Sequence, residues 1–524
     1  HTLRRLGGLP GHPDVGTPYV AANTGALGMG ISKARGMAIA NNTLGKRGRF
    51  FVMTGDGELQ EGAFWESLQP TANGKFGEIT VIVDRNKIQS DIWIKDVSDL
   101  GSLEDKLRAF GWEVARVDGH DATALKNILV RFKTITDRPK IIIADTVKGK
   151  GVSFMEKIAE DGYYKFHSGA PSPENYASAL EEIYGRLNRE LGLLKIEPVV
   201  LESVDPLPKK LPVNPQKLVA AYADELLKIA RERKDLIALD ADLVLDTGLI
   251  PFKKELPAQF VECGIAEQDM VSAAGGLALR GALPVVHSFA CFLTTRPNEQ
   301  IYNNASEGKK IIYTGSLAGL LPSLPGHSHQ SVRDISAIGG MPNMVMIQPA
   351  NELETRLAIR WAVEKSRESV YIRLVSIPCE IPFELPSGHA LELGKGICVR
   401  EGGDALIIAY GPVMLAEAYK AAELLKDKGK NVAVINLPWL NKIDGAWLHG
   451  EANKYKHIFT IDDHYTALGQ GTLVAAELAK RGDHPAIMAL GLTEIPVCGQ
   501  NVEALAYHKL DAASIAERIE KEIK

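Results

Sequence analysis

The chain has 524 residues, of which 45% are hydrophobic and 24% are charged, and its formal net charge is −5. This length suffices for about three domains, and the composition is that of a globular protein able to bury several cores. The small net charge gives no electrostatic reason to expect binding to nucleic acid or to an anionic membrane. The chain has 5 cysteines, an odd number, and no CxxC pair, which favours a reducing compartment over a disulfide framework. No apolar run has the length of a membrane span.

Short β-rich runs alternate with helical patterns along the whole chain, which predicts parallel sheets flanked by helices. In the first block the expected strands are 50–54, 79–84 and 140–145, and the expected helices are 63–69 and 122–132. The range 193–214 contains several prolines and little periodicity, so we expect a linker there.

A second alternating block begins at Pro215 and a third near Leu391, after prolines 378, 382 and 386. In the second block the expected helices are 215–233, 267–279 and one from Glu352, and the expected strands are 236–239, 284–287, 310–313, 344–347 and 370–374. In the third block the expected strands are 405–409, 431–435 and 457–461, with a last helix from Ala512. The sequence therefore predicts three consecutive α/β domains, with bounds 1–192, 215–386 and 391–524.

Polar residues follow the first two expected strands. Asp56 lies between Gly55 and Gly57 directly after the apolar run FFVMT, and Asn86 follows the next run. Strand ends of a parallel sheet bring such side chains together, and carboxylate, amide and carbonyl oxygens are the ligands of a hard divalent cation. Two ordinary strand-to-helix turns are the alternative, because Gly-Asp-Gly is common turn chemistry.

The wider context is more specific. The segments GDGELQEGAFWE and EITVIVDRNKIQSD resemble the thiamine diphosphate motif, and QEG and NKI resemble the transketolase family in particular. The resemblance implies a thiamine diphosphate cofactor held through Mg²⁺, or Ca²⁺ or Mn²⁺, with Asp56, Asn86 and the carbonyl of Ile88 as metal ligands. It also implies that 1–192 binds the diphosphate and 215–386 the pyrimidine, while 391–524 is the C-terminal domain.

A second group is implied to hold and activate the cofactor. Glu267 in GIAEQ resembles the family's activating glutamate, although a glutamate at a helix start is also favoured by the helix dipole. Phe289 and Phe292 in SFACFLTTR correspond to a pair of aromatic residues against the aminopyrimidine, with core packing as the alternative.

Three histidines on separate loops match family positions. His12 lies in PGHP, His167 in HSGAP, where a serine separates the histidine from the glycine, and His329 in HSHQ. Imidazoles can shuttle protons near neutral pH and can hydrogen-bond a substrate rich in hydroxyls. The resemblance implies contact of these residues with substrate or, for His167, also with the cofactor.

Further positions follow from the same resemblance. Gly25 and Leu27 lie in TGALGMG, which matches a loop against the cofactor, while Asp242 in LDADL and Glu61 in QEG match residues near the cofactor and the subunit interface. Arg373 in VYIRL matches an arginine that binds substrate phosphate. Solvated carboxylates at a strand end or a helix start are the alternative for Asp242 and Glu61.

Other positions depart from the family. The chain reads NPQKL where an arginine is expected, Asp246 stands in place of a phosphate-contacting serine, and Gly315 in place of a substrate histidine. The loop LLPSLPGHSHQ lacks the family's acidic residue. These departures leave the thiamine chemistry intact and make a shorter or unphosphorylated substrate plausible.

The implied activity is transfer of a two-carbon ketol unit from a ketose or hydroxypyruvate to an aldose or aldehyde, as in the pentose phosphate pathway. The implied assembly is a cytoplasmic homodimer with its active sites at the subunit interface. The family's leading segment is expected to be absent from this chain, which starts at His1, and a companion N-terminal chain, the boundary of a fragment or a naturally short form would each explain it. The alternatives are a deoxyxylulose-phosphate synthase, the first component of a 2-oxo-acid dehydrogenase, and a non-catalytic relative.

Overall fold

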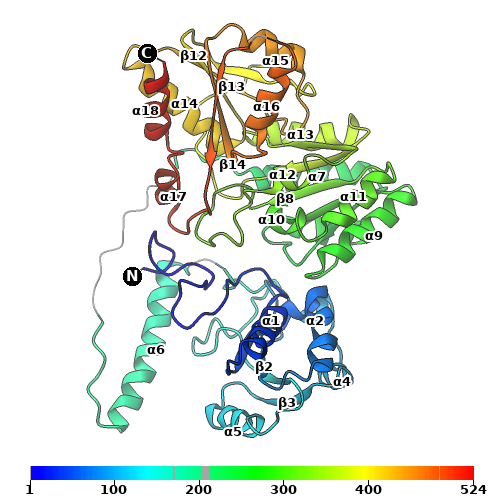
Figure 1. Ribbon diagram of the computed structural model, residues 1–524, viewed down its shortest axis with the longest axis vertical. Coiled ribbons are helices and arrows are strands. Elements are labelled where there is room, and N and C mark those ends of the chain that lie inside the picture. The colour runs from blue at the N-terminus through cyan, green and yellow to red at the C-terminus, as the bar shows by residue number, and fades with distance from the viewer. Residues whose placement is uncertain (1, 169–170, 202–211, 483, 524) are drawn as a thin grey trace. The chain divides into compact units, whose positions relative to one another are not determined.

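The computed structural model describes residues 2–168, 171–201, 212–482 and 484–523. The chain divides into two compact units: a smaller one formed by 26–210 and 264–266, and a larger one formed by 1–25, 211–263 and 267–524. The larger unit holds two sheets and the smaller unit one (Figure 1).

The smaller unit is built on a parallel sheet with the order β1-β2-β4-β3. Its strands are β1 (Phe50–Gly55), β2 (Ile79–Arg85), β3 (Glu113–Asp118) and β4 (Lys140–Asp145). Its helices are α1 (Gly30–Thr43), η1 (Gly57–Gln60), α2 (Gly62–Asn73), α3 (Ile94–Val97), α4 (Leu103–Ala109), α5 (Ala122–Phe132) and α6 (Pro173–Leu193).

The two faces of this sheet are covered by different helices. Apolar residues of α1, α2 and α4 pack with Val52, Val81 and Ile143 in one cluster. Phe132 of α5 packs with Ala115 and Ile142 in another. The central strands β2 and β4 are mostly buried and consist of β-branched runs such as ITVIV, whereas Phe51 and Met53 of β1 are exposed.

The first sheet of the larger unit is parallel, with the order β6-β5-β7-β8-β10-β9. Its strands are β5 (Leu236–Asp240), β6 (Phe260–Glu262), β7 (Leu283–Phe289), β8 (Ile312–Ser316), β9 (Met344–Ile347) and β10 (Ser369–Arg373). The helices along this stretch are α7 (Leu218–Glu232), α8 (Ile250–Glu255), η2 (Pro257–Gln259), α9 (Glu267–Leu279), α10 (Ala290–Leu293), α11 (Asn298–Ser306), α12 (Asp334–Ile338) and α13 (Glu352–Glu364).

The second sheet of the larger unit has the order β11-β13-β12-β14-β15. Its strands are β11 (Ile397–Arg400), β12 (Ala405–Ala409), β13 (Val432–Asn436), β14 (His457–Tyr465) and β15 (Ala486–Leu492). The helices of this stretch are α14 (Pro412–Lys426), α15 (Gly445–Ala452), α16 (Gln470–Ala479), α17 (Asn501–Tyr507) and α18 (Ala512–Glu522). Strand β11 is antiparallel to β13, so this sheet is mixed, whereas the alternating pattern predicted parallel sheets.

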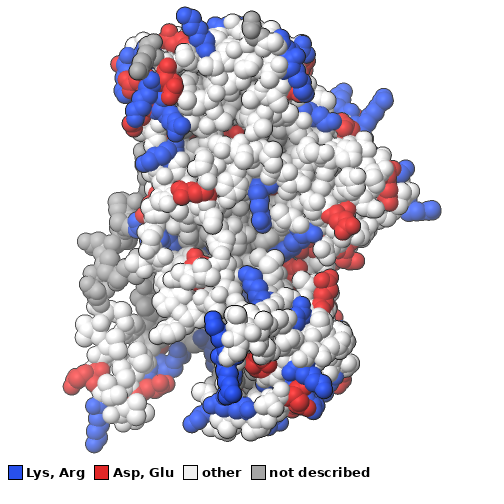
Figure 2. All heavy atoms as spheres, viewed as in Figure 1, with Lys and Arg blue, Asp and Glu red and all other residues white. Residues whose placement is uncertain are grey.

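The predicted fold class is confirmed: the sheets are flanked by helices in an α/β arrangement. Part of the predicted linker, 202–211, lies outside the described residues. Within the described part of the chain, no helix is both long and apolar enough to cross a membrane. Basic and acidic side chains are interspersed over the face that Figure 2 shows, in agreement with the small net charge.

Candidate functional site

The predicted site residues divide between the two units. The smaller unit carries Leu27, Gly55, Asp56, Gly57, Glu61, Asn86, Ile88 and His167. The larger unit carries His12, Gly25, Asp242, Glu267, Phe289, Phe292, His329 and Arg373. Each unit therefore has its own half of the predicted site.

Asp56 and Asn86 follow adjacent parallel strands. Gly55, the last residue of β1, is in register with Asp84 of β2. Oδ1 of Asp56 accepts a hydrogen bond of 3.0 Å from the amide of Gly57, and Oδ2 accepts one of 2.7 Å from the amide of Lys87. The loop that carries Asn86 is thus tied to the Asp56 carboxylate.

The Asp56 side chain suits a cation. Asp56 is only 1% exposed, and this burial raises the pKa of its carboxyl group to about 6, against the opposing effect of the amide of Lys87. A nearby positive charge would stabilise the ionised form, and an added Cβ at Gly55 would have no atom within 4 Å. The space and the charge beside Asp56 therefore fit a metal-bound diphosphate.

The possible ligands at this site are mostly neutral. Oδ1 of Asn86 accepts a hydrogen bond of 3.1 Å from the amide of Ile88, and the carbonyl of Ile88 is the third predicted ligand. One carboxylate, one amide and one carbonyl form an oxygen set suited to Mg²⁺ that leaves room for phosphate oxygens. Among the described residues, no group of three or more His, Cys, Asp or Glu side chains is arranged to hold a metal.

Lys148 lies next to the Ile88 carbonyl and to His167. Its Nζ is 3.4 Å from the carbonyl oxygen of Ile88 and 3.0 Å from Nδ1 of His167, and it lies over the ring of Tyr164. An ammonium group only donates hydrogen bonds, so Nδ1 of His167 is the acceptor. The neutral His167 ring then carries its proton on Nε2, which makes Nε2 a hydrogen-bond donor.

The glycine-rich turn of the smaller unit lies against the start of α2. The amide of Gly28 donates a hydrogen bond of 2.8 Å to Glu58, and an added Cβ at Gly28 would lie 3.1 Å from Cβ of Glu61. Glu61 is 7% exposed, while Leu27 is half-buried. Glu61 is thus a packed residue of this turn and not a solvated helix-start carboxylate.

Glu267 is the first residue of α9 and is 2% exposed. Its Oε1 forms an ion pair of 2.6 Å with Nη1 of Arg296, whereas Oε2 has no hydrogen-bond partner among the described residues. A buried carboxylate oxygen without a donor is costly, so a ligand that donates a hydrogen bond would stabilise Oε2. The aminopyrimidine predicted from the sequence would be such a ligand.

Two imidazoles and two phenyl rings gather in the same unit. The rings of His12 and His329 are stacked, with centroids 4.3 Å apart and planes at 4°. Phe292 and Phe289 have ring centroids 5.0 and 5.9 Å from that of His329. The structure therefore brings together four predicted residues from three distant parts of the sequence.

Hydrogen bonds fix the tautomer of His12. Its Nδ1 is 2.7 Å from the carbonyl oxygen of Pro325, which can only accept, so Nδ1 carries a proton. In the neutral ring Nε2 is then a hydrogen-bond acceptor. Oγ of Ser328 lies 3.0 Å from Nδ1 of His329, whose ring is stacked on that of His12.

The Asp242 region is strongly acidic. Asp242 is 3% exposed, has a left-handed backbone with φ of 61°, and its amide donates a hydrogen bond of 2.9 Å to Oε1 of Glu262. Burial raises the pKa of Asp240 well above its usual range, and the charge of Glu262 adds to this effect. Burial also raises the pKa of Asp246. Asp242 is thus a buried residue at a constrained turn and not a solvated strand-end carboxylate.

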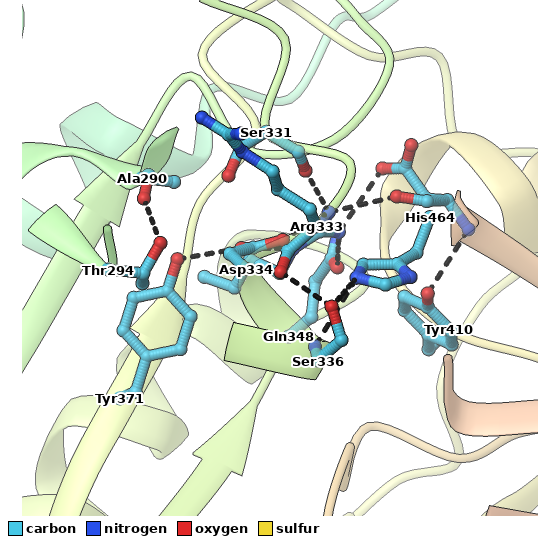
Figure 3. A network of polar contacts seen from close by, with 12 residues as sticks. Ala290, Thr294, Ser331, Arg333, Asp334, Ser336, Gln348, Tyr371, Tyr410 and His464 are labelled. Atoms are coloured by element: carbon cyan, nitrogen blue, oxygen red, sulfur yellow. Dashed lines mark hydrogen bonds and ion pairs between the residues drawn. The ribbon is translucent and has the colours of Figure 1, made fainter. Parts of the chain in front are cut away.

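Arg373 lies in the interior and does not reach a solvent-exposed site. The residue is 0% exposed, and its guanidinium donates to Asp334 at 2.8 Å, to Gln348 and to the carbonyls of Ser331 and Asp463. Figure 3 shows Asp334 at the centre of this network, where it also accepts a hydrogen bond from Tyr371. This burial does not fit the predicted contact of Arg373 with substrate phosphate, because its donors are already used inside the protein.

Gly315, where a substrate histidine was expected, has no room for a side chain. An added Cβ would lie 2.6 Å from the hydroxyl of Tyr371 and 2.9 Å from Cα of Ala290. Lys148 and Arg296 are not among the site residues predicted from the sequence. Both follow expected elements, Lys148 after β4 and Arg296 after the phenylalanine pair, and cations at such positions were the available signal.

The chain is similar to known proteins over most of its length. Three transketolase family models match the chain: the thiamine diphosphate binding domain at residues 2–190, the pyrimidine binding domain at 215–376 and the C-terminal domain at 394–515. Transketolase-like protein 2 of Bos taurus is 30% identical over 488 residues, which cover 90% of this chain and 76% of that protein. Transketolase of Homo sapiens is 29% identical over 533 residues, which cover 99% of this chain and 83% of the human protein.

A solved structure is also similar. It is described as a split gene transketolase in the form of an inactive beta4 tetramer, is 28% identical with a TM-score of 0.53, and the match covers 59% of this chain and 98% of that one. Together with the three matched domains, these similarities show that the chain belongs to the transketolase family.

Proposed function

We propose that this chain is a thiamine diphosphate-dependent transketolase that moves a two-carbon ketol unit from a ketose or hydroxypyruvate to an aldose or aldehyde. The observation that carries the proposal is the buried Oε2 of Glu267, which has no hydrogen-bond partner among the described residues. When bound, thiamine diphosphate would supply a carbon nucleophile and an electron sink. The domain division proposed with it is 1–192 for the diphosphate, 193–214 as linker, 215–386 for the pyrimidine and 391–524 as the C-terminal domain.

The proposed roles follow from the contacts of each residue. Oε2 of Glu267 would hold a proton shared with the aminopyrimidine, while the rings of Phe289 and Phe292 would pack against it. Asp56, Asn86 and the carbonyl of Ile88 would hold Mg²⁺, or Ca²⁺ or Mn²⁺, on the diphosphate. Gly55 and Gly57 would allow close approach of the backbone.

The substrate would be handled by imidazoles. Nε2 of His12 would accept a proton from a substrate hydroxyl, and Nε2 of His167 would donate a hydrogen bond to one, in line with the Nδ1 contacts of the two rings. His329, which is stacked on His12, would take part in the same proton transfers. Arg373 has no direct part in the proposal.

We also propose a cytoplasmic homodimer whose sites each combine the smaller unit of one subunit with the larger unit of the other. All five cysteines are free, which agrees with a reducing compartment. The proposed partners also include a companion chain, in line with the similar protein that is described as a split gene transketolase.

The departures from the family favour an acceptor without phosphate. Asp246 stands where a phosphate-binding serine was expected, and the guanidinium of Arg373 is engaged in the interior. Unphosphorylated aldehydes with hydroxypyruvate as donor should therefore give a higher kcat/KM than pentose phosphates. A clear preference for pentose phosphates would contradict this assignment.

The test of the reaction itself is a donor and acceptor panel on purified protein. Ketol product should form from hydroxypyruvate and a short aldehyde, and only with thiamine diphosphate and a divalent metal. Release of carbon dioxide from pyruvate would instead indicate a synthase or a 2-oxo-acid dehydrogenase component. No product from any pair would indicate a non-catalytic relative.

A further inference from the structure

Arg296 is the strongest polar neighbour of Glu267, and neither the sequence motifs nor the proposed function assigns it a role. The two side chains form an ion pair of 2.6 Å and are 13% and 2% exposed, respectively. Arg296 lies between α10 and α11, and Glu267 opens α9, which packs against α11 (Figure 1). The ion pair thus joins two segments of one packed unit.

The guanidinium is held from a second side. Its central carbon lies 4.0 Å from the centroid of the Phe292 ring, and the carbonyl of Arg296 accepts a hydrogen bond of 3.2 Å from Nε2 of Gln268. A planar guanidinium stacked on an aromatic ring has little rotational freedom, and arginine is better suited to this than lysine. Arg296 therefore links Glu267 to Phe292, both of which are predicted to contact the cofactor.

The two oxygens of the Glu267 carboxylate have different contacts. Oε1 is used by Arg296, while Oε2 is buried and has no hydrogen-bond partner among the described residues. A carboxylate fixed through one oxygen presents the other in a defined direction.

We propose that Arg296 is a positioning residue that aims Oε2 of Glu267 at the aminopyrimidine of thiamine diphosphate; this inference rests on the proposed function. Arg296 would act only through Glu267 and through the stack on Phe292. Its loss should therefore weaken cofactor binding and slow proton exchange on the bound cofactor, while the fold is kept.

The experiment compares Arg296→Met, Arg296→Lys, Glu267→Gln and the double variant Arg296→Met with Glu267→Gln in the full chain. Calorimetry measures the affinity for thiamine diphosphate with Mg²⁺, and NMR measures hydrogen–deuterium exchange at C2 of the bound cofactor. Arg360→Met is the matched control, because Arg360 forms a comparable ion pair of 2.5 Å with the buried Glu225 on α7. Circular dichroism verifies that each variant is folded.

Arg296→Met should lower the affinity and the exchange rate by about 10- to 100-fold, the range for residues that orient a direct ligand. Arg296→Lys should lie between Met and the native residue, and Arg360→Met should match the native protein. In the Glu267→Gln background, Arg296→Met should have no further effect on exchange.

Two results would overturn the inference, and they are distinguishable. If the native chain binds cofactor with Mg²⁺ and folded Arg296→Met binds and exchanges equally, Arg296 has no positioning role while the proposed function stands. If the native chain itself does not bind the cofactor, the proposed function fails and the inference falls with it. If Arg296→Met does not fold, the same two measurements on Arg296→Lys decide whether Arg296 has a positioning role.

Discussion

At the scale of single residues, the candidate chemistry depends on buried carboxylates, whose removal from water costs free energy. Asp56 and Glu267 are 1% and 2% exposed, and each is held through backbone amides or an arginine. Burying a carboxylate disfavours its charged form, so such residues persist where a ligand compensates the charge. The proposed cofactor site therefore depends most on the carboxylates of Asp56 and Glu267.

Gly25 illustrates how closely the backbone packs near the stacked histidines. Its φ is +92°, and an added Cβ would lie 2.3 Å from Oγ of Ser328 and 3.0 Å from Cγ of His12. Gly25→Ala should therefore destabilise the protein by about 1–3 kcal/mol through backbone strain and steric overlap. Urea unfolding followed by circular dichroism measures this change.

Gly450→Ala serves as the control, since an added Cβ there meets no atom within 4 Å inside α15. It should leave the free energy of unfolding unchanged or raise it by up to about 1 kcal/mol. Equal stability of Gly25→Ala and the native protein would show that this turn is not constrained.

How well the sequence predicts a site residue depends on how local its partners are. Asp56 and Asn86 each follow a strand, and their proximity results directly from the parallel pairing of those strands. The stacking of His12 on His329 joins residues far apart in the sequence, and no local pattern specifies it. The burial of Arg373 depends on Asp334 and Asp463 from other segments, so its motif alone does not specify its surroundings.

At the scale of elements, strand β14 carries an unusual run of buried polar residues. Asp462, Asp463 and His464 are each at most 2% exposed, and Asp463 lies 3.4 Å from the Arg373 guanidinium at the end of β10. Figure 3 shows His464 beside Ser336 of α12, whose amide nitrogen and hydroxyl oxygen each lie 3.4 Å from Nε2 of His464. This polar network joins the two sheets of the larger unit through ion pairs rather than through apolar packing alone.

The network predicts a specific pH dependence of stability. Burial raises the pKa of Asp463 to about 6, above its usual value of 3.8. A raised pKa in the folded state means that the stabilisation from this group is full below about pH 4 and is lost as the pH rises through about 6. Between pH 5 and pH 8, Asp463→Asn should therefore gain about 1.4 kcal/mol in unfolding free energy relative to the native protein, because pH 5 lies one unit below the folded pKa.

Urea unfolding at several pH values measures this difference. Asp427→Asn on the exposed end of α14 is the control and should show no change relative to the native protein between the two pH values. If the difference for Asp463→Asn stayed constant from pH 5 to pH 8, the Asp463 carboxyl would not titrate in this range.

The elements themselves differ in how visible they are in the sequence. Buried strands such as β2 and β12 are continuous β-branched or apolar runs, so their positions are predictable to within a few residues. Helix α1 was not predicted, because it begins in a glycine-rich stretch and mixes polar and apolar residues without a clear period. The antiparallel strand β11 was not predicted either. The alternation of strands and helices indicates parallel strands and does not indicate an additional antiparallel strand at the edge of the sheet.

At the scale of the whole molecule, the candidate site consists of two half-sites on different units. Asp56 and Asn86 belong to the smaller unit, and Glu267 with the stacked histidines belongs to the larger one. The proposed homodimer would combine half-sites from two subunits, so an inactive variant of one kind should complement an inactive variant of the other.

Mixed dimers of Asp56→Asn and Glu267→Gln subunits test this arrangement. Each parent should be inactive, whereas a purified hybrid should regain one of its two sites and about half of the native activity, because one site receives both native residues. Two different affinity tags allow isolation of the hybrid. A hybrid as inactive as its parents would rule out sites shared between subunits.

Calorimetric titration of the purified chain with thiamine diphosphate measures whether these residues form a metal-dependent cofactor site. With Mg²⁺ present the native chain should bind thiamine diphosphate, and chelation of the metal or Asp56→Asn should weaken binding by at least about 100-fold, since the carboxylate is the only charged ligand proposed. Equal binding with and without metal, or unchanged binding by Asp56→Asn, would show that these residues do not form a metal-dependent cofactor site.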